Sequence, residues 1–523
     1  MKVAIHSITI KALKALTFLY CTLMFTFFLF YTENAYFNIT DAKYHCFVWL
    51  TLGYALSCII CGSFYLFFHD SPINFIKNQL VSLSSTDKSM LLMLGAHTIT
   101  TISCEYPQYS FSGAWGRHMG LGFTILICIM YFLVSRFLTH HRILIHIFLG
   151  SCLIVGCIGI LNALGIDPFH YYINVKQSQR HMFLSTIGNT TFFAHMFCLT
   201  LPIGFSLFLN ATSLRKRIVY LIWTMLGFVS IYISNIDGAY LAVFAFLLYF
   251  FMNCRDAMQM KDFLLICLTA LCTAKCLSLL SYGSGALVFE GVSALIVLSP
   301  FVWILIGIVL LLYLWMRKYP DKAEALPYHK IKTMVLMSAG IIILLLLVAI
   351  VYFTWLKPSA SLGDLSDYLR FSDTWGHNRG YLWRVFTTDF IHSSPLERMF
   401  GKGLDCTKFI MSDISGKSLA TAYYDNAHNE YLQYLITSGI IGLSAYLFLW
   451  GSLIHRLYQI KHHPYATGLC AALLAHGAQA ITGLNQPITT PLLFLLFAIS
   501  ERLLRRTSAS KTADSSADDT SST

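Results

Sequence analysis

The chain has 523 residues, of which 56% are hydrophobic and only 12% are charged. A soluble domain carries about 25% charged residues, so this composition excludes a soluble globular protein. The net charge of +11 does not indicate nucleic-acid binding, because the basic residues are not gathered on one domain. Length and composition therefore predict a membrane protein whose spans each need roughly 20 apolar residues.

Fourteen apolar runs are candidates to cross a membrane as helices. They lie at about residues 13–31, 44–68, 89–104, 118–138, 143–165, 190–209, 218–233, 238–252, 263–281, 287–316, 333–356, 429–450, 466–482 and 487–501. They predict an all-α polytopic membrane protein with about 14 transmembrane helices, within a range of 12–14. The short runs at 218–233 and 238–252 also fit a broken pair or a re-entrant hairpin around Ser234–Gly238, so both interpretations stand.

The charge distribution predicts how the chain sits in the membrane. With the N-terminus in the cytoplasm, the cytoplasmic turns and ends hold 23 lysines and arginines, whereas the short outer loops hold five. Because cytoplasmic loops are enriched in Lys and Arg, both termini are predicted to be cytoplasmic and the number of spans even. Residues 1–31 are expected to be an uncleaved first span rather than a signal peptide, since the apolar run is long and no clear small-x-small cleavage site follows it.

One large extramembrane segment interrupts the spans. The predicted parts are spans 1–11 in 1–356, a large extracytoplasmic loop at 357–428, spans 12–14 in 429–503, and a cytoplasmic tail at 504–523. The loop carries eight basic and eight acidic residues, and its length and mixed charge indicate a folded functional unit. The tail is rich in Ser, Thr, Ala and Asp and is predicted to be disordered.

Residues 378–392 within the loop are predicted to form an amphipathic helix of the type that can lie at the membrane surface. The apolar residues near one face are Leu382, Val385, Phe386, Phe390 and Ile391. Arg384 lies on another face, where we expect it to snorkel or to pair with Asp389.

The fifteen cysteines do not indicate a disulfide framework. Most of them lie inside predicted spans, where cysteine acts as a small apolar side chain, and Cys406 is the one cysteine of the large loop. No pair of cysteines has the company of further zinc ligands, so the sequence predicts no metal site.

Polar residues gather at the outer ends of several spans, where a lipid-facing helix would not carry them. They are Arg180, Asn189, Ser234, Asn235, Asp237, Asn426, His428, Asn429, Asn485 and Gln486. Each of them alone is explained by capping a helix or anchoring it at the interface. These residues form four clusters along the chain, at 180–189, 234–237, 426–429 and 485–486. Because all four clusters are predicted to lie on the outer side of the membrane, beneath the large loop, we expect them to form a shared site.

The residue types at these ends favour one kind of chemistry. No Walker loop, HExxH motif or nucleophile elbow occurs in the sequence, and no cofactor is predicted. Arginines bind phosphate in a fixed fork geometry, and a neutral histidine can take a proton from a hydroxyl near pH 7. This combination suits transfer from a phosphate-activated, lipid-borne donor to a hydroxyl acceptor, with a diphosphate leaving group that needs no metal.

Four stretches resemble one family. His428-Asn429-Glu430-Tyr431-Leu432-Gln433, followed by Gly439, resembles the signature of the O-antigen ligase and O-antigen polymerase superfamily. Arg379-Gly380-Tyr381-Leu382-Trp383 is similar to the helix start of that family, and Pro395 with Gly401-Lys402-Gly403 is similar to its turn. Gly188-Asn189-Thr190-Thr191-Phe192-Phe193-Ala194 resembles a further run, from which Thr190 and Thr191 depart.

The resemblance implies a metal-independent, inverting glycosyltransferase of the C type (GT-C) in the bacterial cytoplasmic membrane, with its active site on the extracytoplasmic face. The donor would be a glycan on undecaprenyl diphosphate, and the acceptor a saccharide hydroxyl or a second lipid-linked glycan. Arg379 would bind the diphosphate, and His428 would orient or deprotonate the acceptor. The family often carries another arginine after a serine, but Ser234 here precedes Asn235 and Asp237.

Arg180 or Arg384 is therefore a candidate to replace that missing arginine, and Asp237 to bind a sugar or pair with one of them. Asn189 and Asn429 are further candidates for substrate binding. The plainer alternatives are that Arg379 forms a surface ion pair with Asp373 and that His428 is an interface histidine. Gly401 and Gly403 are predicted to be turn glycines with positive φ.

The leading prediction is cell-surface polysaccharide assembly, by ligation of a finished chain or by polymerisation of repeat units. These two activities share a donor and differ in the acceptor, and the sequence leaves both open. The alternative class is a transporter or flippase of lipid-linked saccharides. The sequence shows no internal repeat, however, and its polar clusters lie at one surface rather than at mid-membrane.

Overall fold

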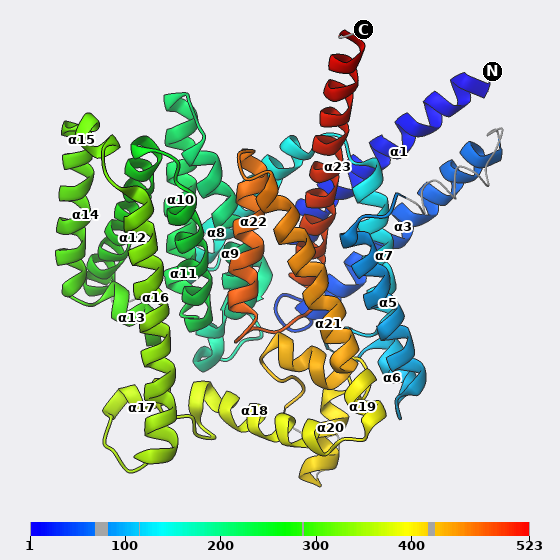
Figure 1. Cartoon of the computed structure of the whole chain (residues 1–523). Helices are drawn as coiled ribbons and strands as arrows, with labels where there is room; N and C mark the ends of the chain where they lie inside the picture. The colour runs from blue at the N-terminus through cyan, green and yellow to red at the C-terminus, as the bar shows by residue number, and fades with distance from the viewer. Residues whose placement is uncertain (1, 68–81, 115, 285–286, 417–423, 522–523) are drawn as a thin grey trace.

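The computed structural model describes residues 2–67, 82–114, 116–284, 287–416 and 424–521. Long helices run back and forth between two ends of the molecule, both termini lie at one end, and the large segment lies at the other (Figure 1). Two short strands, β1 (Phe183–Leu184) and β2 (Gly188–Asn189), pair antiparallel with Phe183 opposite Asn189. The distribution of termini and large segment agrees with an even number of crossings.

The helices follow the apolar runs of the sequence. The long helices before the large segment are α1 (Lys2–Phe25), α3 (Ile39–Phe67), α5 (Ser85–Ser103), α7 (Leu121–Phe137), α8 (His141–Ala163), α9 (Thr190–Leu209), α10 (Leu214–Ser234), α11 (Asp237–Asn253), α12 (Ala257–Ser284), α14 (Phe301–Lys318) and α16 (Tyr328–Val351). Those after it are α21 (Glu430–Gln459), α22 (Pro464–Gln479) and α23 (Thr490–Ser521). The helices of the large segment are α17 (Ser366–Leu369), α18 (Trp375–His392), α19 (Pro395–Phe400) and α20 (Thr407–Ser415). The short helices elsewhere are α2 (Phe27–Phe30), α6 (Pro107–Ser112), α13 (Gly291–Val297) and α15 (Pro320–Glu324), and the shorter helical segments are η1 (Gln177–Met182), η2 (Ser185–Ile187), η3 (Tyr352–Leu356) and η4 (Gly363–Leu365).

Nine helices within the described residues are long and apolar enough to cross a membrane, and the shorter helices α7 and α11 are also apolar. The helices therefore agree with an all-α polytopic membrane protein. The remaining long helices, α5, α22 and α23, lie where further spans are expected, but the number of 14 and the C-type architecture stay predictions.

Three predicted runs differ in detail from the helices. The run at 287–316 is divided into α13 and α14, because Pro300 stands at the start of α14 and cannot continue the preceding helix. The first run is broken at Thr26, between α1 and α2. The runs on either side of Ser234–Gly238 form two complete helices, α10 and α11, that lie antiparallel (Figure 1), rather than a short re-entrant hairpin.

The interior of the bundle surrounds α9. This helix is the most enclosed of the candidate spans, because 94% of the residues in its apolar stretch are buried. It packs against α10 and α22. By contrast, none of the residues in the apolar stretch of α16 is buried, as suits a helix that faces lipid. The core is therefore formed by helices that precede the large segment in the chain, above all α9, and by helices that follow it, above all α22.

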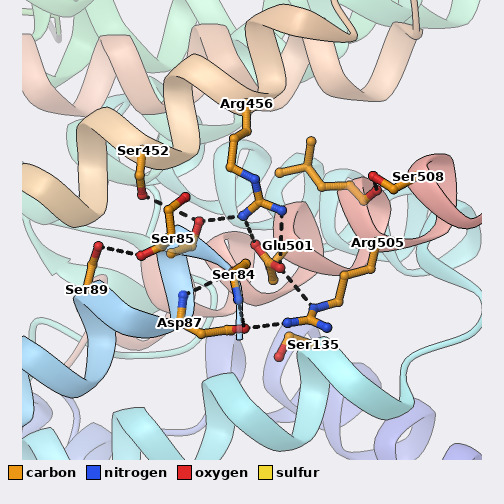
Figure 2. Close-up of polar contacts among 12 residues, drawn as sticks. Ser84, Ser85, Asp87, Ser89, Ser135, Ser452, Arg456, Glu501, Arg505 and Ser508 are labelled. Atoms are coloured by element: carbon orange, nitrogen blue, oxygen red, sulfur yellow. Dashed lines mark hydrogen bonds and ion pairs between the residues drawn. The ribbon is translucent and has the colours of Figure 1, made fainter. Parts of the chain in front are cut away.

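A buried ion-pair network ties four helices at the end that carries the termini (Figure 2). Asp87 of α5 accepts from Arg136 of α7 at 2.8 and 2.9 Å and also from Arg505 of α23. Glu501 of α23 pairs with Arg505 at 2.9 Å and with Arg456 of α21. Both carboxylates are fully buried, so each depends on these arginines for its compensation.

The tail differs from the sequence prediction. Residues 504–523 were expected to be disordered, whereas helix α23 continues from Thr490 through Ser521. Helix propagation adds one hydrogen bond for each residue fixed, so an apolar helix that is anchored in the bundle can extend into a polar sequence.

Candidate functional site

The large segment forms a layer across the end of the bundle, with α18 lying across the long helices (Figure 1). It has a small core of its own, made by Leu382, Phe386, Ile410, Met411, Ala427 and Ile436. The expected helix is present as α18, and its Leu382 and Phe386 are buried in this protein core, although Ile391 is 61% exposed. Burial of one face of α18 fixes the direction of its other side chains.

Arg379 and Trp383 of α18 lie one turn apart, on the side of the helix next to residue 427. Gly376, His377 and Asn378 all have positive φ, so the regular helix begins at Arg379. Four residues later, the indole Nε1 of Trp383 donates to the carbonyl oxygen of Ala427 at 3.1 Å. This hydrogen bond holds the backbone that leads into His428 beside α18.

His428 lies in a tight turn before α21. Its φ is 49°, and its backbone N–H donates to Asn426 Oδ1 at 2.9 Å. Burial lowers the pKa of His428, and the positive charges of Arg379 and Arg117 lower it further, to about 4. The imidazole is therefore neutral at pH 7 and is close enough to the guanidinium groups of Arg379 and Arg117 to be affected by their charge.

Arg117 reaches the site from the turn between α6 and α7. Its Nε and Nη2 donate to the two carboxylate oxygens of Asp425 at 3.0 and 2.9 Å. Burial alone would raise the pKa of Asp425, but Arg117 outweighs that effect and holds the pKa below its ordinary value. The bidentate pair fixes Arg117 to Asp425, which precedes His428 by three residues in the chain.

Asp405 holds the turn that carries Arg117. Its Oδ2 accepts from the backbone N–H groups of Ala114 at 2.8 Å and Met119 at 3.0 Å. Asp405 is buried, and burial raises its pKa to about 7 against the effect of these two amides. It is a positioning residue, because it acts on Arg117 through the backbone.

Arg379 has hydrogen-bonding capacity to spare. Its Nη1 donates to the carbonyl of Gly376 at 3.0 Å, while its Nε is buried and has no hydrogen-bond partner within the described residues. Burial lowers the pKa of Arg379, and the nearby carboxylate of Asp237 opposes that effect. Such a guanidinium is available to an anionic ligand.

Asp237, at the start of α11, connects the large segment to the bundle. Its Oδ1 accepts from the backbone of Val292 at 2.8 Å, and its Oδ2 accepts from the Tyr368 hydroxyl at 3.3 Å. Asp237 is thus close enough to Arg379 to affect its pKa, as the prediction that it pairs with an arginine requires. Its hydrogen bonds, however, go to Val292 and Tyr368, so it mainly holds these two segments together.

The two arginines proposed as replacements lie elsewhere. Arg384 pairs with Asp373 at 2.8 and 2.9 Å, with 54% and 55% of the two side chains exposed. Asp373 therefore pairs with Arg384 and not, as the plainer alternative had it, with Arg379. The alternative pair of Arg384 with Asp389 is wrong, because Asp389 binds Lys402 instead, at 2.7 Å. Arg180 is exposed and lies over the ring of Tyr172, 5.6 Å from its centroid.

The two asparagines act as helix caps. Asn189 Oδ1 accepts from the backbone N–H of Thr191 at 2.8 Å at the start of α9. Asn429 Oδ1 accepts from Leu432 at 3.0 Å at the start of α21. Both side chains satisfy helix N–H groups, which is the plainer alternative for such residues.

The glycines of the motif allow two backbones to touch. Gly401, Gly403 and Gly439 have φ of 80°, 117° and 70°, so the predicted turn glycines are confirmed. Gly439 breaks α21, and the carbonyls of Ile436 and Thr437 accept from the amides of Lys402 and Gly403 at 3.0 and 3.2 Å. A β-carbon on Gly439 would lie 2.3 Å from the carbonyl oxygen of Met399. This contact fixes α19 against the start of α21.

Sequence reasoning missed Arg117, Asp425 and Asp405. Arg117 is one of five basic residues in the short outer loops, and it directly precedes an apolar run, so the criterion used for the other polar clusters would have selected it. Its pairing with Asp425 has no local signal, because the two residues meet only through the tertiary fold.

The assembled site consists of His428, Arg379 and Arg117, with Asp425 and Asp237 as their carboxylate neighbours. Two guanidinium groups with a neutral imidazole can bind an oxyanion and accept a proton from a hydroxyl. Across the described ranges, no group of three or more His, Cys, Asp or Glu side chains is arranged to hold a metal ion.

Residues 284–447 match the sequence model of a family described as O-antigen ligase. The match contains Arg379 and His428, whereas Arg117, Arg180 and Asp237 precede it. It confirms the family resemblance found in the motifs and supports a part in cell-surface polysaccharide assembly with glycosyltransferase-like chemistry. No curated protein matched the chain in a separate search.

Proposed function

We propose that the chain is a member of the O-antigen ligase and polymerase superfamily, whose sequence model matches residues 284–447, and that it transfers a glycan from undecaprenyl diphosphate to a saccharide hydroxyl. The reaction would take place at the outer face of the bacterial cytoplasmic membrane. The observation that carries the proposal is geometric: Arg379 lies on the helix whose Trp383 donates to Ala427, and Arg117 is paired with Asp425, so both arginines stand close to His428.

The two arginines provide the binding site for the diphosphate. Arg379 has an unused buried Nε, and Arg117 is held in a bidentate pair that leaves part of its guanidinium free of Asp425. Guanidinium groups match phosphate oxygens in geometry and stabilise the charge that develops on a departing diphosphate. In this proposal they take the part of the family arginine that is missing after Ser234, because Arg180 is exposed and Arg384 is held in an exposed pair with Asp373.

His428 acts as the base. In the free protein its pKa is about 4, partly because of the two arginines, so the imidazole is neutral and can accept a proton. A bound diphosphate neutralises those arginines and therefore raises the pKa of His428 towards its ordinary value. The donor would in this way make the histidine a stronger base at the moment the acceptor has to lose its proton.

The reaction balances without a metal. The acceptor oxygen attacks the anomeric carbon of the donor as its proton passes to His428. The bond from that carbon to the diphosphate oxygen breaks, and the leaving group keeps the electron pair beside Arg379 and Arg117. Attack opposite the leaving group inverts the anomeric configuration.

Ligation and polymerisation are separated by the acceptor. We would reconstitute the purified protein in liposomes with lipid-diphosphate-linked repeat units alone, and then add a different saccharide acceptor. Growth of a ladder from repeat units alone identifies a polymerase, whereas product that forms only after the second addition identifies a ligase.

The same liposomes test the alternative of transport. A flippase would move the lipid-linked saccharide between leaflets without forming a new glycosidic bond. Movement without any product, in wild type and in His428→Ala alike, would overturn the proposal. Normal insertion of His428→Ala with loss of product would support it.

A further inference from the structure

Two cysteines from distant parts of the chain meet beside Gly403. A β-carbon placed on Gly403 would lie 2.8 Å from Cys406 Sγ and 3.2 Å from Cys104 Sγ. The two sulfurs are therefore separated by no more than the sum of these distances. Because Gly403 has no side chain, both sulfurs can lie this close to its backbone.

The chain around both cysteines is firmly held. Cys104 directly follows α5. One turn earlier in that helix, the Thr100 hydroxyl donates a hydrogen bond to the carbonyl oxygen of Phe400 at 2.5 Å. On the other side, the N–H of Leu404 donates to Ser110 Oγ at 2.9 Å. These bonds fix the end of α5 against the turn that carries Cys406, so the approach of the two thiols is a property of the fold.

The two thiols share a pocket at the outer end of the bundle. The pocket is lined by both cysteines together with Glu105, Tyr106, Asp389, Lys402 and Asp413, among others. Cys104 is half-buried, whereas Cys406 is fully buried, and burial raises the pKa of the Cys406 thiol well above its ordinary value. Cys104 is therefore the thiol that an incoming reagent meets first.

We propose that Cys104 and Cys406 form a disulfide in the mature protein. This inference rests on the proposed function in one respect, namely that the large segment faces the oxidising extracytoplasmic compartment, where disulfides persist. Cys406 is the one cysteine of the large loop, and Cys104 stands at the end of the predicted span 89–104 that leads outward, so the predicted topology places both thiols at that compartment.

The oxidation is a thiol–disulfide exchange with a disulfide-bearing oxidant of that compartment, a protein or a small molecule. The Cys104 thiolate attacks one sulfur of the oxidant, breaks its S–S bond and releases the first thiol. Cys406 then loses its proton and attacks Cys104 Sγ of the mixed disulfide, which releases the second thiol. Two cysteine thiols are thereby oxidised by two electrons, and one disulfide of the oxidant is reduced to two thiols.

The bond would act on the proposed catalytic site. Cys406 directly follows Asp405, whose carboxylate holds the turn that carries Arg117. A covalent link from Cys406 to the end of α5 would fix Asp405 in place and, through it, the arginine beside His428. The disulfide is thus a positioning device for the site.

Thiol counting tests the proposal directly. The full-length protein is purified from native membranes under acid quench, denatured, and labelled with a mass-tagged maleimide with and without prior reduction. We expect two fewer reactive thiols than the fifteen of the sequence unless the protein is first reduced, and a Cys104–Cys406 cross-linked peptide in the mass spectrum. The double variant Cys104→Ser/Cys406→Ser should show no change in thiol count upon reduction, whereas Cys272→Ser should still show the loss of two.

Fifteen reactive thiols in the unreduced wild-type protein, with no cross-linked peptide even after treatment with oxidised glutathione, would overturn the proposal. Orientation is measured separately, with Ser361→Cys in the double variant and a membrane-impermeant maleimide on intact cells. Labelling of that cysteine without a disulfide in the wild type would refute the disulfide alone. A disulfide without labelling would support the bond and refute the proposed orientation.

Discussion

Arg117 and Asp425 form a bidentate ion pair that joins the turn before α7 to the chain just before α21. The arginine side chain is 18% exposed and the aspartate 37%. The pair is anchored on one side by Asp405 and lies on the other side next to His428. It thereby connects the first half of the chain to the family motif in the second half.

If Arg117 binds the donor diphosphate, its charge and its fork geometry are both needed. We expect Arg117→Gln to reduce glycan transfer by about 100-fold or more, the typical effect of removing one electrostatic donor from a transition state. Arg180→Gln is the matched control on the same face and should stay near wild type, because Arg180 is exposed. Transfer rates in reconstituted liposomes measure both.

A purely structural role for Arg117 has a different signature. If the arginine only neutralises Asp425, the double variant Arg117→Gln/Asp425→Asn should recover transfer, since it removes both charges. We expect no recovery. Restored activity in the double variant would remove Arg117 from the proposed diphosphate site.

Arg379 and Arg384 provide a matched pair on one helix. Arg379→Lys should fail nearly as badly as Arg379→Ala, because a point charge cannot replace the planar fork. Arg384→Lys should keep most of the activity, since Arg384 is held in an exposed pair with Asp373, and such pairs contribute little. Chain-length distributions on gels would measure the difference, and full activity of Arg379→Lys would indicate a mere ion pair.

The pKa of His428 should respond to its charged neighbours. It is about 4, below the ordinary 6.5, so the imidazole is neutral above that pH and becomes charged as the pH falls through it. Because Arg379 contributes to the lowering, Arg379→Gln should raise the pKa. Diethyl pyrocarbonate modifies only neutral imidazole, so the pH at half-maximal modification of the His428 peptide should shift upward. Arg384→Gln should leave it unchanged.

Two glycines of α21 should respond in opposite ways to alanine. Gly439→Ala puts a β-carbon 2.3 Å from the Met399 carbonyl oxygen, at a φ of 70° and a ψ of −173° that only glycine adopts readily, where an L-residue costs on the order of 1–3 kcal/mol before any clash. We expect a clear drop in the thermal unfolding midpoint and in yield. Gly451 has open space around its α-carbon, and Gly451→Ala should be neutral or stabilising by up to about 1 kcal/mol. Equal midpoints for the two variants would contradict the backbone contact at Gly439.

Much of the fold could be predicted because the membrane imposes it. A run of apolar residues in lipid has to be helical, so the runs locate the long helices well, even where Thr26 or Pro300 interrupts them. The large segment and α18 were also predictable, from a change of charge pattern and from helical periodicity. The packing of the other helices around α9 could not be predicted, because an apolar run does not indicate which helices it contacts.

The candidate site was predictable only in part. Arg379 and His428 stood in recognisable motifs, whereas Arg117 and Asp425 meet through the tertiary fold alone. The wrong partner predicted for Arg384 has a simple reason, since Asp389 lies five residues further along the helix and so projects from another face. Asn189 and Asn429 looked like ligands because helix caps and binding residues have the same polarity.

The break at Gly439 would set the depth of the proposed site in the membrane. About 20 residues of α21 follow it, and at 1.5 Å per residue they extend about 30 Å, the thickness of the hydrocarbon layer. The first turns of α21, with His428 before them, would then stand just above the acyl chains. That is the level of the lipid headgroups, so a polyprenyl carrier could keep its tail in the bilayer while its two phosphates reach Arg379 and Arg117.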